Sequence, residues 1–180
     1  MENEIKQIKA PKKITTTRLR NIALYYLKMF ESSRANLRDV LRRRVNKYAY
    51  FDKSFDKNAA YQYIEALLDD FEAHKYIDDA RFAELKIRGY LAVGKSPRYV
   101  LGKMREKGVD ETLALRILEQ EDYDPYESAV KLAKKKKIGP FEADENKRRE
   151  NRGKDLASLL RAGFDYDVAM KVLDIVVEDN

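Results

Sequence analysis

Apolar side chains recur at spacings of three and four residues along most of the chain, with polar residues between them. One run places Leu37, Val40 and Leu41 on a single helical face, and a later run does the same with Leu156 and Leu159. This spacing is typical of amphipathic α-helices. We therefore predict a helical chain, in which the helices that open successive units span residues 17–30, 79–93 and 125–137.

The helical pattern repeats along the chain. A shift of 55 positions brings the segment that begins at Ser96 onto the segment that begins at Asn151, and a shift of 64 positions brings Ser32 onto Ser96. The pairs matched by the first shift include Leu101 with Leu156, Met104 with Leu159, Gly108 with Gly163, Val109 with Phe164 and Asp110 with Asp165. A repeat period of about 50 residues is typical of stacked helical units.

The sequence thus predicts an all-α fold, an elongated array of three tandem three-helix repeats. The predicted divisions are a flexible N-terminal tail at 1–14 and repeats at 15–76, 77–123 and 124–180. The first repeat lacks the glycine that the other two share, and it carries the insertion NKYAYFDKSFDKN before its third helix.

In the two later repeats a glycine and an aspartate separate the second helix from the third. Gly108 and Gly163 fall where a helix commonly ends in a left-handed residue. Asp110 and Asp165 fall where an N-cap residue would open the next helix.

Two adjacent carboxylates, Asp78 and Asp79, precede the fourth predicted helix. They could bind a metal ion or perform acid–base chemistry, but either role needs further ligands that the sequence does not identify. A carboxylate at a helix N-terminus accepts a free backbone N–H and is worth ~1 kcal/mol. We interpret the pair as a helix cap, and predict no metal site.

Composition excludes several other kinds of chemistry. The chain has no cysteine, which rules out disulfides and thiolate zinc sites, and its only histidine is His74. We find no phosphate-binding loop or nucleophile–base set, so neither an enzyme nor a cofactor is predicted. No apolar run approaches the ~20 residues that span a bilayer, and the N-terminus lacks the apolar core of a secretory signal. We expect a cytoplasmic protein that does not bind membranes.

Charge alternates with the repeat. The net charge is +6, but each middle helix has a net charge of +4 or +5 and each third helix one of −4 or −5. Aligned middle helices would form a basic stripe suited to a phosphate backbone or an acidic protein groove. Alternatively, the two kinds of helix neutralise each other across unit boundaries as weak exposed ion pairs.

A longer motif resembles a known family. The segment YIDDARFAELKIRGYLAVGKSPRYVLGKMREKGVD, residues 76–110, is similar to the central signature of the RecX family, regulators of the RecA recombinase. The resemblance extends over roughly residues 15–177. Lys75 departs from it, since family members usually have glycine before the aromatic residue, and so does the insertion in the first repeat.

The resemblance implies a non-catalytic regulator, an inhibitor that binds the RecA–single-stranded DNA filament and lowers its ATPase activity, strand exchange and growth. A basic face would make the contact, and we expect the protein to act as a monomer. The predicted contact residues are Arg34, Arg38, Arg42, Lys95, Arg98, Lys103, Arg148, Arg149 and Arg152.

The alternative function is a free-standing DNA-binding protein built from helix-turn-helix-like modules. Its recognition helices would begin with acids, such as Asp110 and Glu111, which repel phosphate. Tyr48, Tyr50 and Phe51 lie among basic residues and could stack on bases, although such a cluster more often packs beneath a loop.

Overall fold

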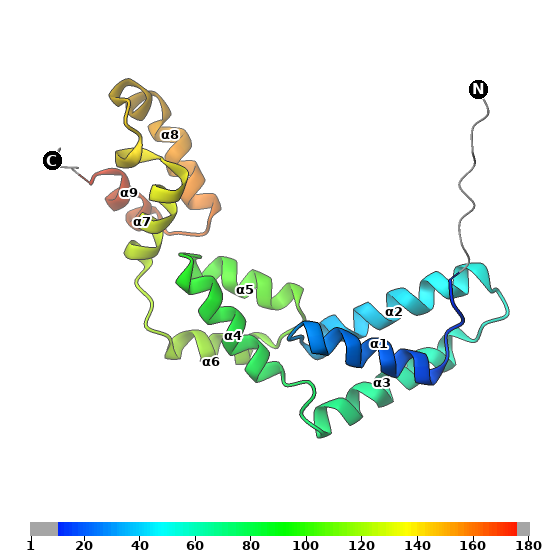
Figure 1. Cartoon of the computed structure of the whole chain (residues 1–180). Helices are drawn as coiled ribbons and strands as arrows, with labels where there is room; N and C mark the ends of the chain where they lie inside the picture. The colour runs from blue at the N-terminus through cyan, green and yellow to red at the C-terminus, as the bar shows by residue number, and fades with distance from the viewer. Residues whose placement is uncertain (1–10, 176–180) are drawn as a thin grey trace, which may run out of the picture. The chain divides into compact units, whose positions relative to one another are not determined.

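The structure is a computed structural model that describes residues 11–175. Within this range it contains nine α-helices and one short 3-10 helix, and no strand (Figure 1). The predicted all-α fold is confirmed. The elements are α1 (Thr16–Met29), α2 (Arg34–Phe51), α3 (Lys57–Ala73), α4 (Asp79–Ala92), α5 (Pro97–Glu106), α6 (Glu111–Gln120), α7 (Pro125–Lys136), η1 (Gly139–Phe141), α8 (Glu145–Arg161) and α9 (Tyr166–Leu173).

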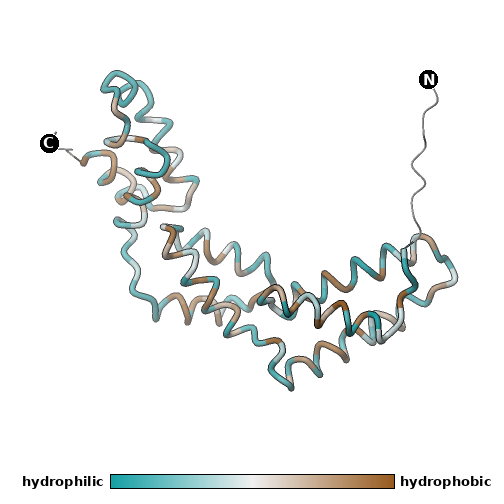
Figure 2. The backbone as a smooth tube through the Cα atoms, viewed as in Figure 1, coloured by the Kyte–Doolittle hydropathy of each residue, from teal (hydrophilic) through white to brown (hydrophobic). Residues whose placement is uncertain are grey.

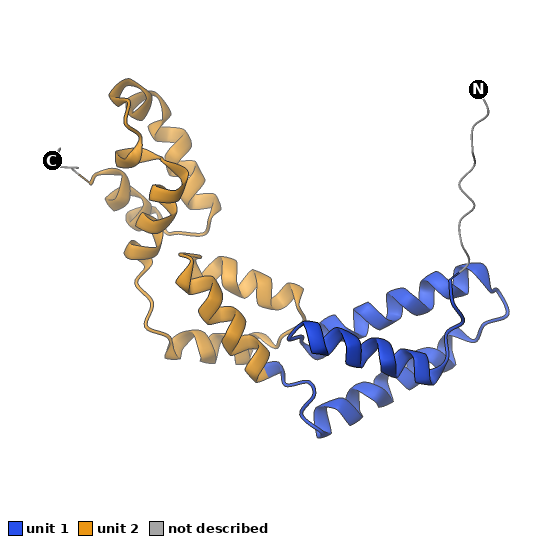
Figure 3. Cartoon of the chain, viewed as in Figure 1, with its two compact units in different colours: residues 1–79 blue, residues 80–180 orange. Residues whose placement is uncertain are grey.

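The chain divides into two compact units, residues 1–79 and residues 80–180 (Figure 3). The three predicted repeat boundaries stay a prediction. Most of the predicted tail, residues 1–10, lies outside the described residues, as do residues 176–180. Ile14, at the end of that predicted tail, is buried against the first unit.

The first unit packs α1, α2 and α3 around one apolar core. Thr15, Ser33 and Asp56 cap the three helices, because each side chain accepts a backbone N–H three residues further along. Hydrophobic and hydrophilic positions are interspersed along the helices, as Figure 2 shows, and hydrophobic residues from all three helices form the core. The largest fully buried side chains are Leu19, Leu37, Leu41, Val45, Ile64, Leu68, Phe71 and Ile77.

Helix α2 of this unit is longer than the repeat pattern predicts. It continues to Phe51 and therefore includes the first six residues of the insertion, 46–51. Tyr48 explains the extension: its ring packs edge-on against Phe55, and its hydroxyl donates to Asp52 Oδ2 at 3.1 Å. The helix continues because this residue has apolar contacts beneath it.

The second unit contains two smaller cores. Helices α4, α5 and α6 surround the first, which includes Phe82, Ile87, Val100 and Met104. The second core lies between α7, α8 and α9, and its buried residues are Ala129, Ala133, Leu159, Phe164, Ala169, Val172 and Leu173. Gly108 and Gly163 have φ values of 66° and 91°, which confirms the left-handed helix ends predicted for them.

A buried serine connects the two cores of the second unit. Ser96 caps α5, where its Oγ accepts the N–H of Tyr99, and the same Oγ donates to the carbonyl of Ala162 at 2.6 Å. Gly163 allows this close approach, since a Cβ at that position would lie 2.5 Å from Ser96 Oγ. The end of α8 is thereby held against the start of α5.

Candidate functional site

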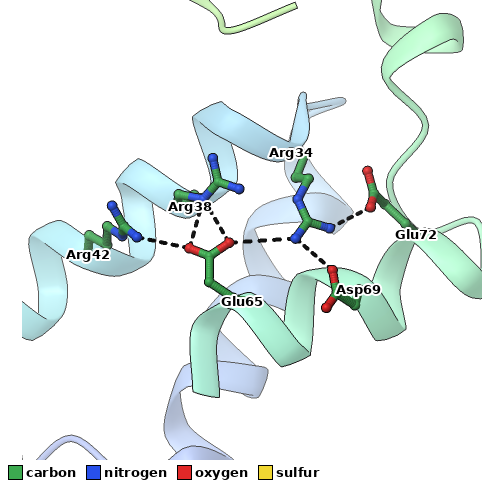
Figure 4. Close-up of polar contacts among 6 residues, drawn as sticks. All are labelled: Arg34, Arg38, Arg42, Glu65, Asp69 and Glu72. Atoms are coloured by element: carbon green, nitrogen blue, oxygen red, sulfur yellow. Dashed lines mark hydrogen bonds and ion pairs between the residues drawn. The ribbon is translucent and has the colours of Figure 1, made fainter. Parts of the chain in front are cut away.

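Three of the predicted contact residues, Arg34, Arg38 and Arg42, point from α2 toward the acidic side of α3 (Figure 4). Glu65 receives all three: Arg38 Nε and Arg42 Nη2 each lie 2.9 Å from its Oε1, and Arg34 Nη2 lies 3.5 Å from its Oε2. Arg34 also pairs with Asp69, at 2.7 Å, and with Glu72. We call this set of six residues the α2–α3 ion-pair ladder.

The ladder changes the ionisation of its members. Burial would raise the pKa of Glu65, but the hydrogen bond from Arg38 and the charges of the arginines outweigh it and lower that pKa. Burial would likewise lower the pKa of Arg34, but its hydrogen bonds to Asp69 and Glu72 raise it. The charges of these arginines are therefore largely compensated inside the first unit, between neighbouring helices of one unit rather than across a unit boundary.

The four predicted capping aspartates each take a different arrangement. Asp110 accepts the N–H of Leu113 at 3.0 Å and so caps α6. Asp165 occupies the N-cap position of α9 without a side-chain cap hydrogen bond. Asp79 begins α4, but its Oδ1 accepts the backbone N–H of Arg34 at 2.7 Å, so the hydrogen bond serves the first turn of α2. Asp78 is half-buried beside it, with Lys75 Nζ 4.0 Å away.

Burial is the main cause that raises the pKa of Asp79, and the nearby charge of Glu72 adds to it. Such a carboxylate could in principle be catalytic. However, no group of three or more histidine, cysteine or acidic side chains that could hold a metal ion occurs within residues 11–175. The hydrogen bond to α2 accounts for the position of Asp79.

In the second unit, cationic side chains surround a pocket of about 260 Å³ between α5, α7 and α8. Lys95, Lys136 and Arg161 line it, together with Tyr99 and Ser158, and none of its described lining residues is acidic. We call it the α5–α8 cationic pocket. Sequence reasoning selected Lys95 but missed Lys136 and Arg161. The run Lys134–Lys137 was the available signal for Lys136.

Three predicted contact residues lie on α5 or just before it, and one of them, Lys95, lines this pocket. Lys95 Nζ is 4.7 Å from the centroid of the Tyr99 ring, a cation–π contact. Arg98 is exposed and packs its Cβ against the turn at Gly163. Lys103 faces Glu106, with Nζ 2.7 Å from the carboxylate. Arg98 is therefore the most accessible of these three cations.

The three predicted residues on α8 differ in their contacts. Arg152 reaches α9, where it donates hydrogen bonds to the Asp174 carboxylate and to the carbonyl of Leu173. Its positive charge thus offsets the partial negative charge at the C-terminal end of that helix. Arg149 pairs with Glu145 one turn earlier on the exposed helix surface. The Nε atom of Arg148 is buried and has no hydrogen-bond partner among the described residues.

The aromatic cluster of the insertion is divided between core and surface. Tyr48 packs against the first core, while Tyr50 and Phe51 are exposed and meet edge to face. Lys53 Nζ lies 4.9 Å from the centroid of the Tyr50 ring. The interpretation of this cluster as one that packs beneath a loop is thus confirmed for Tyr48 and wrong for Tyr50 and Phe51.

The nine α-helices of residues 11–175 define an all-α protein whose second unit carries a cationic pocket. None of the described helices is long and apolar enough to cross a membrane. Comparison with known proteins identifies the family. Residues 78–116 match the family profile described as "RecX, second three-helix domain".

Two curated relatives and one solved structure extend this match. The chain is 36% identical to the regulatory protein RecX of Myxococcus xanthus over 92% of this chain and 89% of that protein. It is 34% identical to the regulatory protein RecX of Shewanella oneidensis over 63% of this chain and 98% of that protein. The crystal structure of RecX from Lactobacillus salivarius superposes with a TM-score of 0.62 at 25% identity, over 89% of this chain and 97% of that one. The chain belongs to the RecX family of regulatory proteins.

Proposed function

We propose that this protein is a non-catalytic regulator of a RecA-type recombinase, which it inhibits by binding the recombinase–single-stranded DNA filament. Membership of the RecX family supports a regulatory role. The observation that carries the mode of binding is the α5–α8 cationic pocket with Arg98 beside it, since these charges have no acidic neighbour in the pocket lining. A filament of protein and DNA presents the acidic surface that such a pocket would bind. This function places the protein in the cytoplasm, where it would act as a monomer.

The structure favours some of the predicted contact residues over others. Arg34, Arg38 and Arg42 are compensated by α3, so reversing their charge would disturb the fold as well as any contact. Arg98 and Arg161 are exposed and take part in no ion pair among the described residues. We therefore assign the principal filament contact to Lys95, Arg98, Lys136 and Arg161.

The test uses a double neutralisation, Arg98→Gln with Arg161→Gln, and measures ATP hydrolysis by recombinase on single-stranded DNA. Two exposed charge contacts of about 0.5–1 kcal/mol each would be lost. The concentration needed for half-maximal inhibition should rise roughly 5- to 30-fold.

The matched control is Arg116→Gln with Lys171→Gln, which removes the same charge from exposed positions on α6 and α9. Its inhibition should match that of the unmodified protein. Equal inhibition by both double variants would contradict the assignment of the pocket. No inhibition by the unmodified protein at any concentration would contradict the proposed function itself.

A further inference from the structure

A second cationic region lies in the first unit, on the side of α2 that turns away from the α2–α3 ion-pair ladder. Two adjoining hollows of about 280 and 480 Å³ run between α1 and α2, and they share Arg18, Ile22 and Arg44 in their lining. We call them together the α1–α2 groove. Its cationic side chains are Lys12, Arg18, Arg44 and Lys47.

The charge of this groove is uncompensated among the described residues. None of the four cations forms an ion pair there, and no described acidic side chain lines either hollow. The Nε atom of Arg18 is buried without a hydrogen-bond partner. Helix α1 contains no acid, and α2 contains only Asp39. Four like charges around one groove attract an anionic ligand, because their mutual repulsion falls when that ligand binds.

The other lining residues indicate the kind of anion. Thr17 and Asn21 supply neutral hydrogen-bonding groups, and Ile22 supplies an apolar patch in the groove lining. Tyr25 stands at the rim with 71% of its surface exposed. Cations that follow a backbone, combined with an aromatic ring on which a base can stack, are the usual elements of single-strand binding.

We propose that the α1–α2 groove binds single-stranded nucleic acid, with Lys12, Arg18, Arg44 and Lys47 on the phosphodiester backbone and Tyr25 stacked on a base. A duplex fits this arrangement less well, because its bases are already stacked inside the helix and cannot reach the ring. The site does not depend on the proposed function, since it would hold nucleic acid in the absence of any recombinase.

The experiment measures binding of the full chain alone to a fluorescein-labelled oligothymidylate of about 15 nucleotides by anisotropy. In Arg44→Glu with Lys47→Glu, affinity at low salt should fall about tenfold or more. The slope of log affinity against log salt should become shallower by about 1.4, the value for two phosphate contacts on a single strand. Tyr25→Ala should lower affinity about 5- to 100-fold with little change in that slope, while Tyr25→Trp should retain it.

The matched control is Lys53→Glu with Lys57→Glu, which makes the same change of charge at exposed positions of the same unit that do not line the groove. Circular dichroism melting curves verify that each variant is folded. Equal losses in the groove variant and the control would overturn the site, as would equal affinity for a duplex of the same length. Displacement of the oligonucleotide by polyglutamate at equal charge concentration would also overturn it, because an acidic peptide would then suffice as ligand.

Discussion

Lys75 holds a backbone conformation that suits glycine better than any other residue. It follows α3 with φ of 59°, and the N–H groups of Lys75 and Tyr76 bond back to the carbonyls of Glu72 and Phe71. This pattern closes a helix with a left-handed residue. A Cβ in that region is strained by roughly 1–2 kcal/mol. The RecX resemblance implies glycine at this position, and the departure from it at Lys75 is costly because of this backbone conformation.

The substitution Lys75→Gly should raise the free energy of unfolding by about 0.5–1 kcal/mol, since relief of strain exceeds the added entropy of the unfolded chain. The exposed contact between Lys75 and Asp78 contributes little to this balance. Urea unfolding followed by circular dichroism measures the change. Lys53→Gly, at an exposed loop position without a positive φ, is the control and should give no gain. A destabilised Lys75→Gly protein would refute the argument from strain.

The sequence predicts some of these helix-end features but not others. Gly108 and Gly163 could be predicted because a helix end and a glycine coincide in two aligned repeats. The partner of Asp79 could not, since its hydrogen bond to the Arg34 backbone joins positions 45 residues apart. Local sequence identifies a capping side chain, but tertiary packing decides which helix it caps.

At the scale of elements, α2 has arginines on both sides of its apolar stripe. Arg34, Arg38 and Arg42 face α3, while Arg44 faces α1 with Lys47. A count of charges along the sequence yields a single net charge for α2 and cannot distinguish the side that faces α3 from the side that faces α1. The predicted contact set consequently included the three compensated arginines and omitted the cations of the α1–α2 groove.

Glu65 is the central carboxylate of the ladder, and Glu65→Gln should destabilise the first unit. The free energy of unfolding should fall by about 1 kcal/mol. Three arginines lose their shared partner, but solvent screens these partly exposed ion pairs and keeps the loss small. The lowered pKa of Glu65 means that its contribution is present above the unfolded-state pKa and disappears as the pH falls through the folded-state pKa. The difference between the two proteins should therefore narrow on acidification and at high salt.

Urea unfolding at neutral and acidic pH measures this difference. Gln62→Glu supplies the control, since it adds a carboxylate at an exposed position of the same helix that has no ion pair among the described residues. It should leave the stability nearly unchanged. A Glu65→Gln protein that is as stable as the unmodified protein at neutral pH would show that the ladder does not stabilise the fold.

At the scale of the whole molecule, the repeat pattern predicted the helices and their order. It did not predict how two successive three-helix bundles of the second unit, α4–α6 and α7–α9, are joined. Ser96 aligns with Ser32 in the sequence, but in the structure it is the next residue, Ser33, that caps α2. In the second unit, Ser96 also bonds to Ala162, 66 positions further along the chain. The Ser96 hydroxyl thus both caps α5 and bonds to the end of α8, a role that periodicity along the chain cannot reveal.

Ser96→Ala should therefore weaken both bundles of the second unit. The variant loses an N-cap worth about 1 kcal/mol and a buried hydrogen bond worth about 1 kcal/mol, and it leaves the Ala162 carbonyl without this donor. Amide hydrogen exchange should show faster exchange at the start of α5 and also at the end of α8. Asp110→Ala removes only a cap, from α6, and should accelerate exchange near α6 while leaving the end of α8 protected. Because the two variants differ in whether the lost side chain reaches the second bundle, unchanged exchange at the end of α8 in Ser96→Ala would mean that apolar contacts alone join the bundles.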